Sequence, residues 1–155
     1  MKKIVTWSLA GAIMFGASIT AYADSSPGDV YVTLGKDLTI SQKDVVYKNL
    51  EAENVSENQI IYVTNEEEHQ YLGSYIPKTK IGTKALSSSK ITVGEKDSGL
   101  VLAVDENITY ITEEMYLNAL STAGVKDVKV GVSAPFEVSG TAALTGIIKA
   151  YEEST

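Results

Sequence analysis

The sequence predicts an α/β or α+β fold in which helices pack on a mixed β-sheet. Three observations indicate this class. Short runs of β-branched and aromatic residues, which favour strands, alternate with longer stretches whose apolar residues recur at helical spacing. Threonine or serine stands at the junctions, where its side chain can cap the start of a helix. The residues from Asp24 onward are enough for one domain with one core.

The elements follow in chain order. The expected strands cover residues 30–34, 60–63, 90–93, 99–104, 108–111 and 125–132. The expected helices cover residues 42–52, 64–72, 112–123 and 141–151. The expected caps of these helices are Ser41, Thr64, Thr112, and Ser139 or Thr141. The expected buried positions of the last two helices are Met115, Ala119, Leu120 and Ala123, and then Leu144, Ile147, Ile148 and Tyr151.

Two of these repeated strand–cap–helix units have similar sequences. Residues 62–67 read YVTNEE, and residues 110–114 read YITEE. One explanation of this sequence match is convergence, because short strand-to-helix connections reuse the Thr-x-x-Glu capping chemistry. The alternative explanation is an ancient duplication. Both interpretations favour helices that follow strands and pack back on the sheet.

The N-terminus has the three parts of a secretory signal. Lys2 and Lys3 give a positive start, residues 4–20 carry no charge, and Ala21-Tyr22-Ala23 supplies small residues before Asp24. We therefore expect residues 1–23 to be a signal peptide cleaved after Ala23, and residues 24–155 to form a single exported domain. An uncleaved membrane anchor is the alternative, because the uncharged run is near the lower limit for spanning a bilayer.

Composition excludes several classes of function. The chain has no cysteine, which rules out a lipoprotein anchor, disulfides, thiolate metal sites and a cysteine nucleophile. Without Lys2 and Lys3 the formal net charge of −7 becomes −9, and the chain contains no arginine. Such an acidic surface repels nucleic acid and anionic lipid. We expect no cofactor, no nucleic-acid partner, and no membrane contact once the signal is cleaved.

Several stretches together resemble a known family. They are residues 32–38 (VTLGKDL), 81–88 (IGTKALSS), 111–120 (ITEEMYLNAL), 123–127 (AGVKD) and, above all, 134–147 (APFEVSGTAALTGI). This pattern is similar to the YpuA-like exported family, a domain of unknown function (DUF family 1002). The resemblance implies a secreted or envelope-associated protein of Gram-positive bacteria with no assigned activity and no catalytic residues to transfer. Members of the family continue past residues 149–152 into a further helical region.

Tyrosines and one loop are the candidate binding residues. Tyr71 and Tyr75 are spaced by one helical turn, with Tyr62 just upstream, so together they could stack on glycan or contact a protein partner. The alternative is that they line the edge of a core with only their hydroxyls exposed. The loop Ser139-Gly140-Thr141 offers backbone N–H groups at a helix start, which suits an anion but also describes an ordinary N-cap.

Catalytic and metal signals are weak. Residues 87–90 match the Ser-x-x-Lys motif of wall enzymes, but its Ser-Asp-Asn and Lys-Thr-Gly partners are missing. His69 is the only histidine, so a Glu66/His69 metal site lacks further ligands and we expect no metal. We therefore predict a binding module of the cell envelope or medium that contacts protein or glycan. The alternative is a cell-envelope hydrolase that uses residues 87–90 and His69.

Overall fold

The structure, a computed structural model, describes residues 25–154. The expected signal peptide, residues 1–23, lies outside these described residues. No helix within residues 25–154 is long and apolar enough to cross a membrane.

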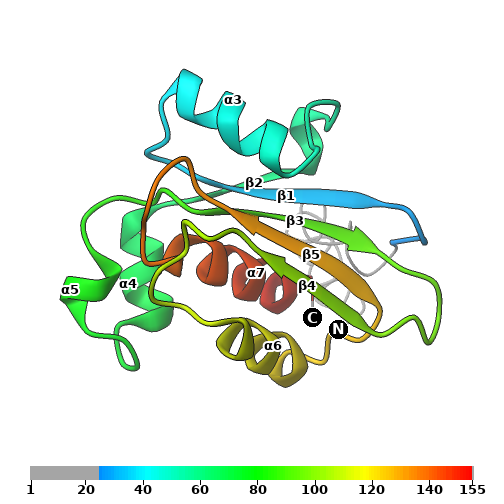
Figure 1. The fold of residues 1–155 in the computed structure, drawn as a ribbon. Coiled ribbons are helices and arrows are strands. Elements are labelled where there is room, and N and C mark those ends of the chain that lie inside the picture. The colour runs from blue at the N-terminus through cyan, green and yellow to red at the C-terminus, as the bar shows by residue number, and fades with distance from the viewer. Residues whose placement is uncertain (1–24, 155) are drawn as a thin grey trace, which may run out of the picture.

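A mixed five-stranded sheet forms the centre of the molecule (Figure 1). Its strands are β1 (Val30–Gly35), β2 (Ile60–Val63), β3 (Ser88–Val93), β4 (Leu100–Val104) and β5 (Val128–Ser133). They lie in the order β2-β1-β3-β5-β4. The outer pairs β1/β2 and β4/β5 are parallel, whereas β3 runs antiparallel to both of its neighbours. The predicted α/β class with a mixed sheet is confirmed.

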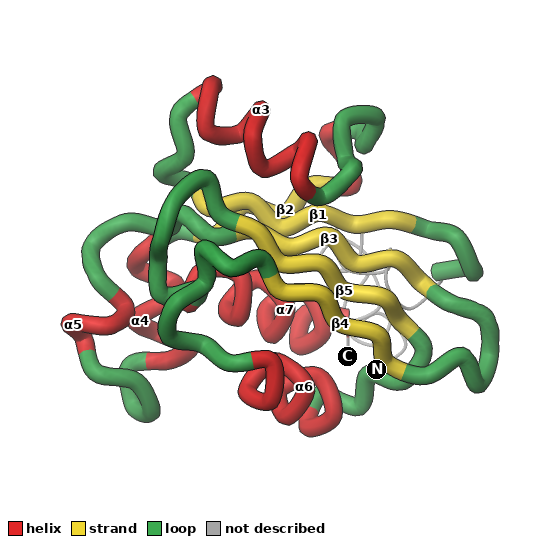
Figure 2. Tube along the Cα trace, viewed as in Figure 1, coloured by secondary structure: helices red, strands yellow, loops and turns green. Residues whose placement is uncertain are grey.

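Helices cover the two faces of the sheet unequally (Figure 2). They are α3 (Ile40–Asn49), the 3-10 turn η1 (Glu57–Gln59), α4 (Asn65–Leu72), α5 (Lys78–Ile81), α6 (Glu113–Thr122) and α7 (Thr141–Ser154). One face carries α3 near β1 and β2, and the opposite face carries α4, α6 and α7. Helix α7 packs against β1, β2 and β3 and contacts α4, α5 and α6, so it is the central helix of that layer.

Alternation along the strands divides the core in two, as the strand period of two requires. The α3 face holds Val32, Leu34, Leu38, Val46, Leu50 and Ala52. The α7 face holds the larger cluster, which includes Ile91, Tyr116, Leu120, Val128, Val130, Val132, Leu144 and Ile147. The sequence predicted one core. Because the sheet is apolar on both sides, the described residues form one large cluster on each face, with a small third cluster of Val63, Ala85 and Ala142.

Small residues bring α7 close to the sheet. A Cβ on Gly146 would lie 2.7 Å from the Cβ of Thr33 on β1, which is closer than real Cβ contacts allow. Thr33 and Ser89 on β3 form a buried hydroxyl pair at 2.6 Å beneath the helix. Ala142, Ala143, Leu144, Ile147 and Ala150 are buried, whereas Ile148 and Tyr151 of the expected stripe are only partly buried. The buried face of this helix therefore differs from the single apolar stripe that was predicted.

Helix caps were predicted in part. Thr64 and Thr112 cap α4 and α6 as expected, and Thr64 forms a complete capping box with Glu67. Ser41 was wrong as a cap, because Thr39 caps α3 and pairs with Gln42, and Ser41 lies inside the helix. Thr39-x-x-Gln42 and Ser41-x-x-Asp44 have the same spacing, so the local pattern alone cannot choose between them.

Three of the expected strands differ from the structure by more than one residue. The expected strand at residues 108–111 is absent, because only Ile108 forms an isolated bridge, with Val138. Strand β5 begins at Val128 and not at residue 125. Strand β3 begins at Ser88, two residues earlier than expected. Its buried serines bond to neighbouring groups, which lets polar residues occupy a strand that apolar patterning would not assign.

Candidate binding groove

An apolar groove of about 630 Å³ opens between α6, the second half of α7 and the turn after α4. We call it the Tyr75 groove. Its lining residues are Tyr75, Asn118, Ala119, Thr122, Ala123, Ile148 and Tyr151. The four residues from α6 and its end lie along one helical face, at positions i, i+1, i+4 and i+5. None of the lining residues carries a formal charge at neutral pH.

Tyr75 is held in place by a tight turn. Helix α4 ends at Leu72, and the Leu72 carbonyl then accepts the N–H groups of both Tyr75 and Ile76. Ile76 is buried in the core, whereas Tyr75 is 84% exposed. The tyrosine therefore stands at the rim of the groove on an anchored backbone. The expected one-turn helical spacing of Tyr71 and Tyr75 was wrong, because the helix stops between them.

The groove suits apolar groups with a few polar neighbours. Ala119 and Ala123 are small, which leaves space between the helices, and Ile148 adds an aliphatic surface. Burial raises the pKa of Tyr151 to about 12, so its phenol stays protonated and neutral at physiological pH. Asn118 and Thr122 supply an amide and a hydroxyl. The residues that line the groove include no pair of an acid and a base.

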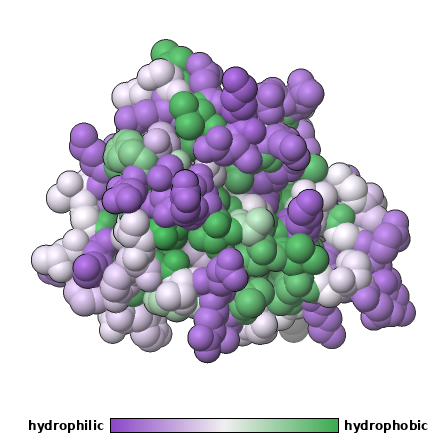
Figure 3. Space-filling model, in the orientation of Figure 1, coloured by the Kyte–Doolittle hydropathy of each residue, from purple (hydrophilic) through white to green (hydrophobic). Residues whose placement is uncertain are grey.

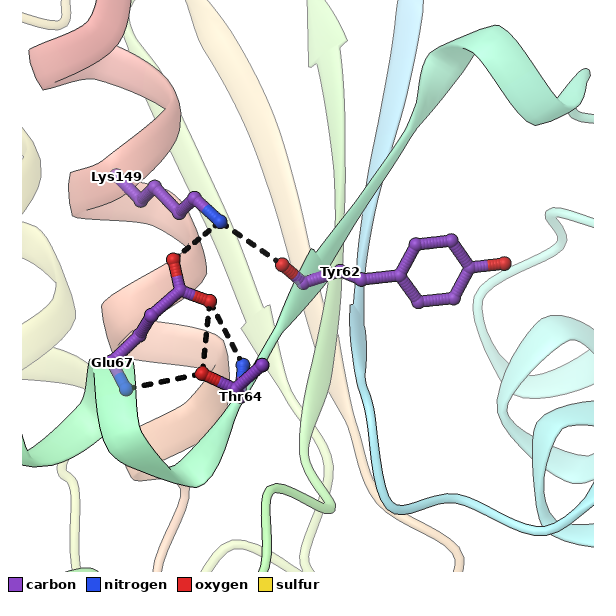
Figure 4. A network of polar contacts seen from close by, with 4 residues as sticks. All are labelled: Tyr62, Thr64, Glu67 and Lys149. Carbon is purple, nitrogen blue, oxygen red and sulfur yellow. Dashed lines mark hydrogen bonds and ion pairs between the residues drawn. The ribbon is translucent and has the colours of Figure 1, made fainter.

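Tyr62 lies on the other side of the sheet from this groove. Its ring packs in the α3-face core, and its hydroxyl donates to Glu57 at 3.0 Å. The ammonium groups of Lys36 and Lys43 lie 4.8 and 5.4 Å from the ring centroid. Figure 4 shows the ring pointing away from Glu67 and Lys149 across β2. Tyr71 is partly buried against the α7-face core. The structure therefore does not bring the three candidate tyrosines together.

The loop Ser139-Gly140-Thr141 binds a carboxyl group of the protein itself. The Thr141 hydroxyl donates to Glu68 at 2.6 Å, and because that uses its only proton, Ser139 donates to Thr141 at 3.1 Å. The Ala143 N–H donates to the Ser87 hydroxyl at 2.8 Å. The Thr141 hydroxyl and the Ala143 N–H at the start of α7 are therefore both bonded to groups of the chain itself.

Gly140 is required at this position by its backbone and its neighbours. Its φ is +94°, and a Cβ there would lie 2.6 Å from the Tyr116 hydroxyl. That hydroxyl donates to the Gly140 carbonyl at 2.8 Å. The loop is therefore a structural joint between α6 and α7.

The Ser-x-x-Lys segment does not form a nucleophile and base. Ser87 accepts from α7 on one face of the sheet, whereas the Lys90 ammonium donates to the Glu51 carbonyl at 2.8 Å on the other. Ser87, Ser88 and Ser89 are all buried. Lys90 therefore cannot activate Ser87, which lacks access to a substrate.

His69 and the acidic helix start also have structural partners. The His69 Nε2 lies 2.9 Å from the Gly82 carbonyl, which can only accept, so this nitrogen carries the proton. Glu67 pairs with Lys149 on α7, which also donates to the Tyr62 carbonyl at 3.2 Å (Figure 4). Within residues 25–154 no cluster of three or more acidic or histidine side chains could hold a metal ion.

A second hollow, of about 480 Å³, lies beside the end of α3 on the open part of the sheet. It contains charges of both signs, from Glu51, Lys90, Asp105 and Lys129. Ser133 donates to Asp105 at 2.9 Å and accepts from Asn49 at 3.1 Å. Several of its polar groups therefore bond one another, and the mixture of charges favours no single ligand class.

Comparisons with known proteins agree with the sequence resemblance. Residues 34–155 match the family described as "Protein of unknown function (DUF1002)". The chain belongs to this family. It is 55% identical over 157 aligned residues to "Uncharacterized protein YpuA" of Bacillus subtilis (strain 168), with the whole chain covered. The chain spans about half of that relative, 53% of its length. No solved structure matches the chain.

Most of the Tyr75 groove was not predicted for this DUF1002 chain from its sequence. Ala119, Ala123, Ile148 and Tyr151 were expected only as buried positions, and Asn118 and Thr122 were not identified. Ala123 is in fact exposed at the end of α6, whereas Tyr116 is fully buried. The available signal was the pair of small residues at i and i+4 on α6, opposite the apolar residues of α7.

The pH dependence of stability tests the contact between Glu68 on α4 and Thr141 on α7. Burial raises its pKa above the ordinary value of 4.5, although Thr141, Asn65 and His69 oppose the rise and Asp37 adds to it. The folded state therefore holds this proton more tightly than the unfolded state, and stability falls as pH rises from 4.5 through the raised pKa. We expect Glu68→Gln to gain stability relative to the unsubstituted protein between pH 4 and pH 7, measured by urea unfolding at each pH.

Glu66→Gln is the matched control, because Glu66 is exposed on the same helix. The pKa of neighbouring Glu67 is shifted in the opposite direction. Burial raises this pKa, but Lys149 and Thr64 outweigh burial and hold the pKa below 4.5. Its contribution is present above 4.5 and is lost as pH falls through the lowered pKa. A relative stability of Glu68→Gln that does not change with pH would contradict the raised pKa of the buried Glu68.

Proposed function

We propose that this chain is an exported binding module that holds apolar side chains of a partner protein in the Tyr75 groove. The observation that carries the proposal is the 84% exposed Tyr75 ring at the rim of an uncharged groove. Exposed aromatic side chains beside apolar hollows are typical of binding surfaces, because they contribute large contact areas with little loss of conformational entropy.

The position of the groove supports the same proposal. Its walls come from α6 and α7, two helices anchored in the larger core by Tyr116, Leu120 and Ile147. A groove between packed helices is preformed, so a partner need not pay for ordering it. Two other candidate groups, Ser87 and Thr141, are occupied by internal bonds. A hydrolase has no such support, since Ser87 and Lys90 lie on opposite faces of the sheet.

The place of action follows from the first 23 residues. Their charge, uncharged run and Ala-x-Ala ending favour export and cleavage after Ala23. The partner is then a protein of the cell envelope or the medium. The chain is acidic, so most of its surface repels other acidic proteins. Contact with such a protein is therefore favoured through an uncharged patch.

Introducing a charge into the groove should abolish binding. We expect Ala119→Lys to lose at least about tenfold in the capture of a partner, because an ammonium would be desolvated against apolar groups. The chain from Asp24 onward is immobilised and exposed to culture supernatant and wall extract of a Bacillus culture, and the captured proteins are quantified by mass spectrometry. A partner counts only if Ala119→Lys and Tyr75→Ala both lose it.

Ile40→Lys is the matched control, because Ile40 is 82% exposed on α3, away from the groove. It should retain the partner. Digesting the extract with protease before capture distinguishes a protein from a glycan: a protein partner disappears, whereas wall glycan is still captured. Equal capture by Ala119→Lys and the unsubstituted chain would refute the groove as the binding site.

A further inference from the structure

The two edges of the sheet are protected unequally. At the β2 edge, the Val63 carbonyl accepts the Lys36 N–H toward β1, so the Tyr62 carbonyl points outward. There it accepts the Lys149 ammonium at 3.2 Å. A lysine that bonds an outer carbonyl blocks the approach of another strand. The opposite edge is β4, which pairs only with β5.

One hydrogen bond between β4 and β5 identifies which backbone N–H and C=O groups of β4 point away from the sheet. The Asp105 N–H donates to the Val132 carbonyl of β5, so Asp105, Ala103 and Val101 face β5. The N–H and C=O groups of Leu100, Leu102 and Val104 therefore point away from the sheet, because successive residues of a strand alternate. No hydrogen bond reaches these groups from the described residues.

Strand β4 also lacks the side chains that usually protect an edge. Its five residues, Leu-Val-Leu-Ala-Val, include no charge, proline or bulge. Val101 is 52% exposed on the face that α3 leaves open, and Ala103 beside it is exposed. Figure 3 shows hydrophobic surface gathered over this part of the sheet. An edge of this kind is a template for pairing with another strand.

We infer that β4 pairs antiparallel with β4 of a second copy of this chain, joining two sheets into one. The outward residues Leu100, Leu102 and Val104 occupy the first, third and fifth positions. A two-fold axis at Leu102 therefore places Leu102 opposite Leu102 of the second copy, and Leu100 opposite Val104. These are hydrogen-bonded pairs of an antiparallel ladder, which exchange two bonds each.

Self-complementarity selects the second copy as the partner. An isologous interface requires that one patch match itself under a two-fold rotation, and a strand with outward groups at positions one, three and five does so. The same register places Val101 of one copy opposite Ala103 of the other. Both side chains lie on the open face, so they can be replaced without disturbing the core.

A charge-swap pair tests this register. Val101→Lys with Ala103→Lys places like charges directly opposite each other twice, and should weaken the dimer by roughly tenfold or more. Val101→Lys with Ala103→Glu places opposite charges at the same two positions and should restore it. Sedimentation over a concentration series measures both, on the whole chain and on the chain from Asp24, so that residues 1–23 are not the cause of association.

Disulfide cross-linking tests the same register independently, because the chain has no cysteine of its own. A mixture of Val101→Cys and Ala103→Cys chains should form the mixed disulfide under mild oxidation, since opposed residues of a non-hydrogen-bonded pair lie about 4.5 Å apart at Cα. Tyr75→Cys, exposed elsewhere, should not cross-link. A chain that stays monomeric at the highest concentration, or a double-lysine variant that associates as well as the unsubstituted chain, would overturn the inference.

Discussion

Replacing Tyr116 with alanine is expected to lower the free energy of unfolding by about 3–5 kcal/mol. Tyr116 is the largest fully buried side chain among the described residues, with 0% exposure. It fills the space between α6 and α7 and contacts the cluster that holds Leu120 and Ile147. Its hydroxyl also donates to the Gly140 carbonyl. Truncation therefore creates a cavity and removes a buried hydrogen bond at the joint before α7.

Tyr116→Phe separates these two effects. It keeps the ring and removes only the hydroxyl, so we expect a loss of about 0.5–1.5 kcal/mol. The Gly140 carbonyl retains the Leu144 N–H at 3.3 Å, which limits the loss. Urea unfolding followed by circular dichroism measures both variants. Equal losses for the alanine and phenylalanine variants would show that packing of the ring does not support the joint.

A lysine at the centre of the uncharged N-terminal run is expected to abolish recovery from the medium. Ile13→Lys places a charge in the middle of residues 4–20, where insertion of a lysine costs about 2.5–3.5 kcal/mol. Fractionation of a Bacillus culture, followed by immunoblotting, should find the variant in the cells. The unsubstituted chain should be found in the medium.

Ala17→Leu is the control for export, because it preserves an uncharged run and should not reduce secretion. N-terminal sequencing of the released chain should begin at Asp24. A chain that stays in the membrane fraction and begins at Met1 would show that the segment is kept as an anchor.

Local sequence signals predicted where helices begin better than they predicted which segments pair or pack together. The Thr64–Glu67 capping box and the Thr112 cap could be identified because each cap bonds within three residues of sequence. The strand expected at residues 108–111 was wrong because Ile108 and Ile111 are apolar for another reason: they contact the α6–α7 core. Apolarity indicates burial, whereas strand pairing depends on neighbours distant in sequence.

The candidate site depended on such distant neighbours throughout. Glu68 meets Thr141, and Ser87 meets Ala143, across separations that no local motif encodes. Residues 139–141 were correctly identified as a helix start, but the Thr141 hydroxyl bonds to Glu68 of the chain itself. The three candidate tyrosines share a stretch of sequence, yet β2 directs Tyr62 to the α3 face and the turn after Leu72 directs Tyr75 to the groove. Tertiary packing, not spacing, decided which of them is exposed.

Site-specific photo-crosslinking tests the binding role of the Tyr75 groove most directly. A photoreactive phenylalanine analogue replaces Tyr75 in one chain and Ile40 in another, two positions of nearly equal exposure at 84% and 82%. Each chain is irradiated in culture supernatant and wall extract, and adducts are identified by mass spectrometry. The proposal predicts a protein adduct at position 75 that is absent at position 40 and lost when Ala119→Lys is added. The same adducts at both positions, or no adduct at position 75, would contradict it.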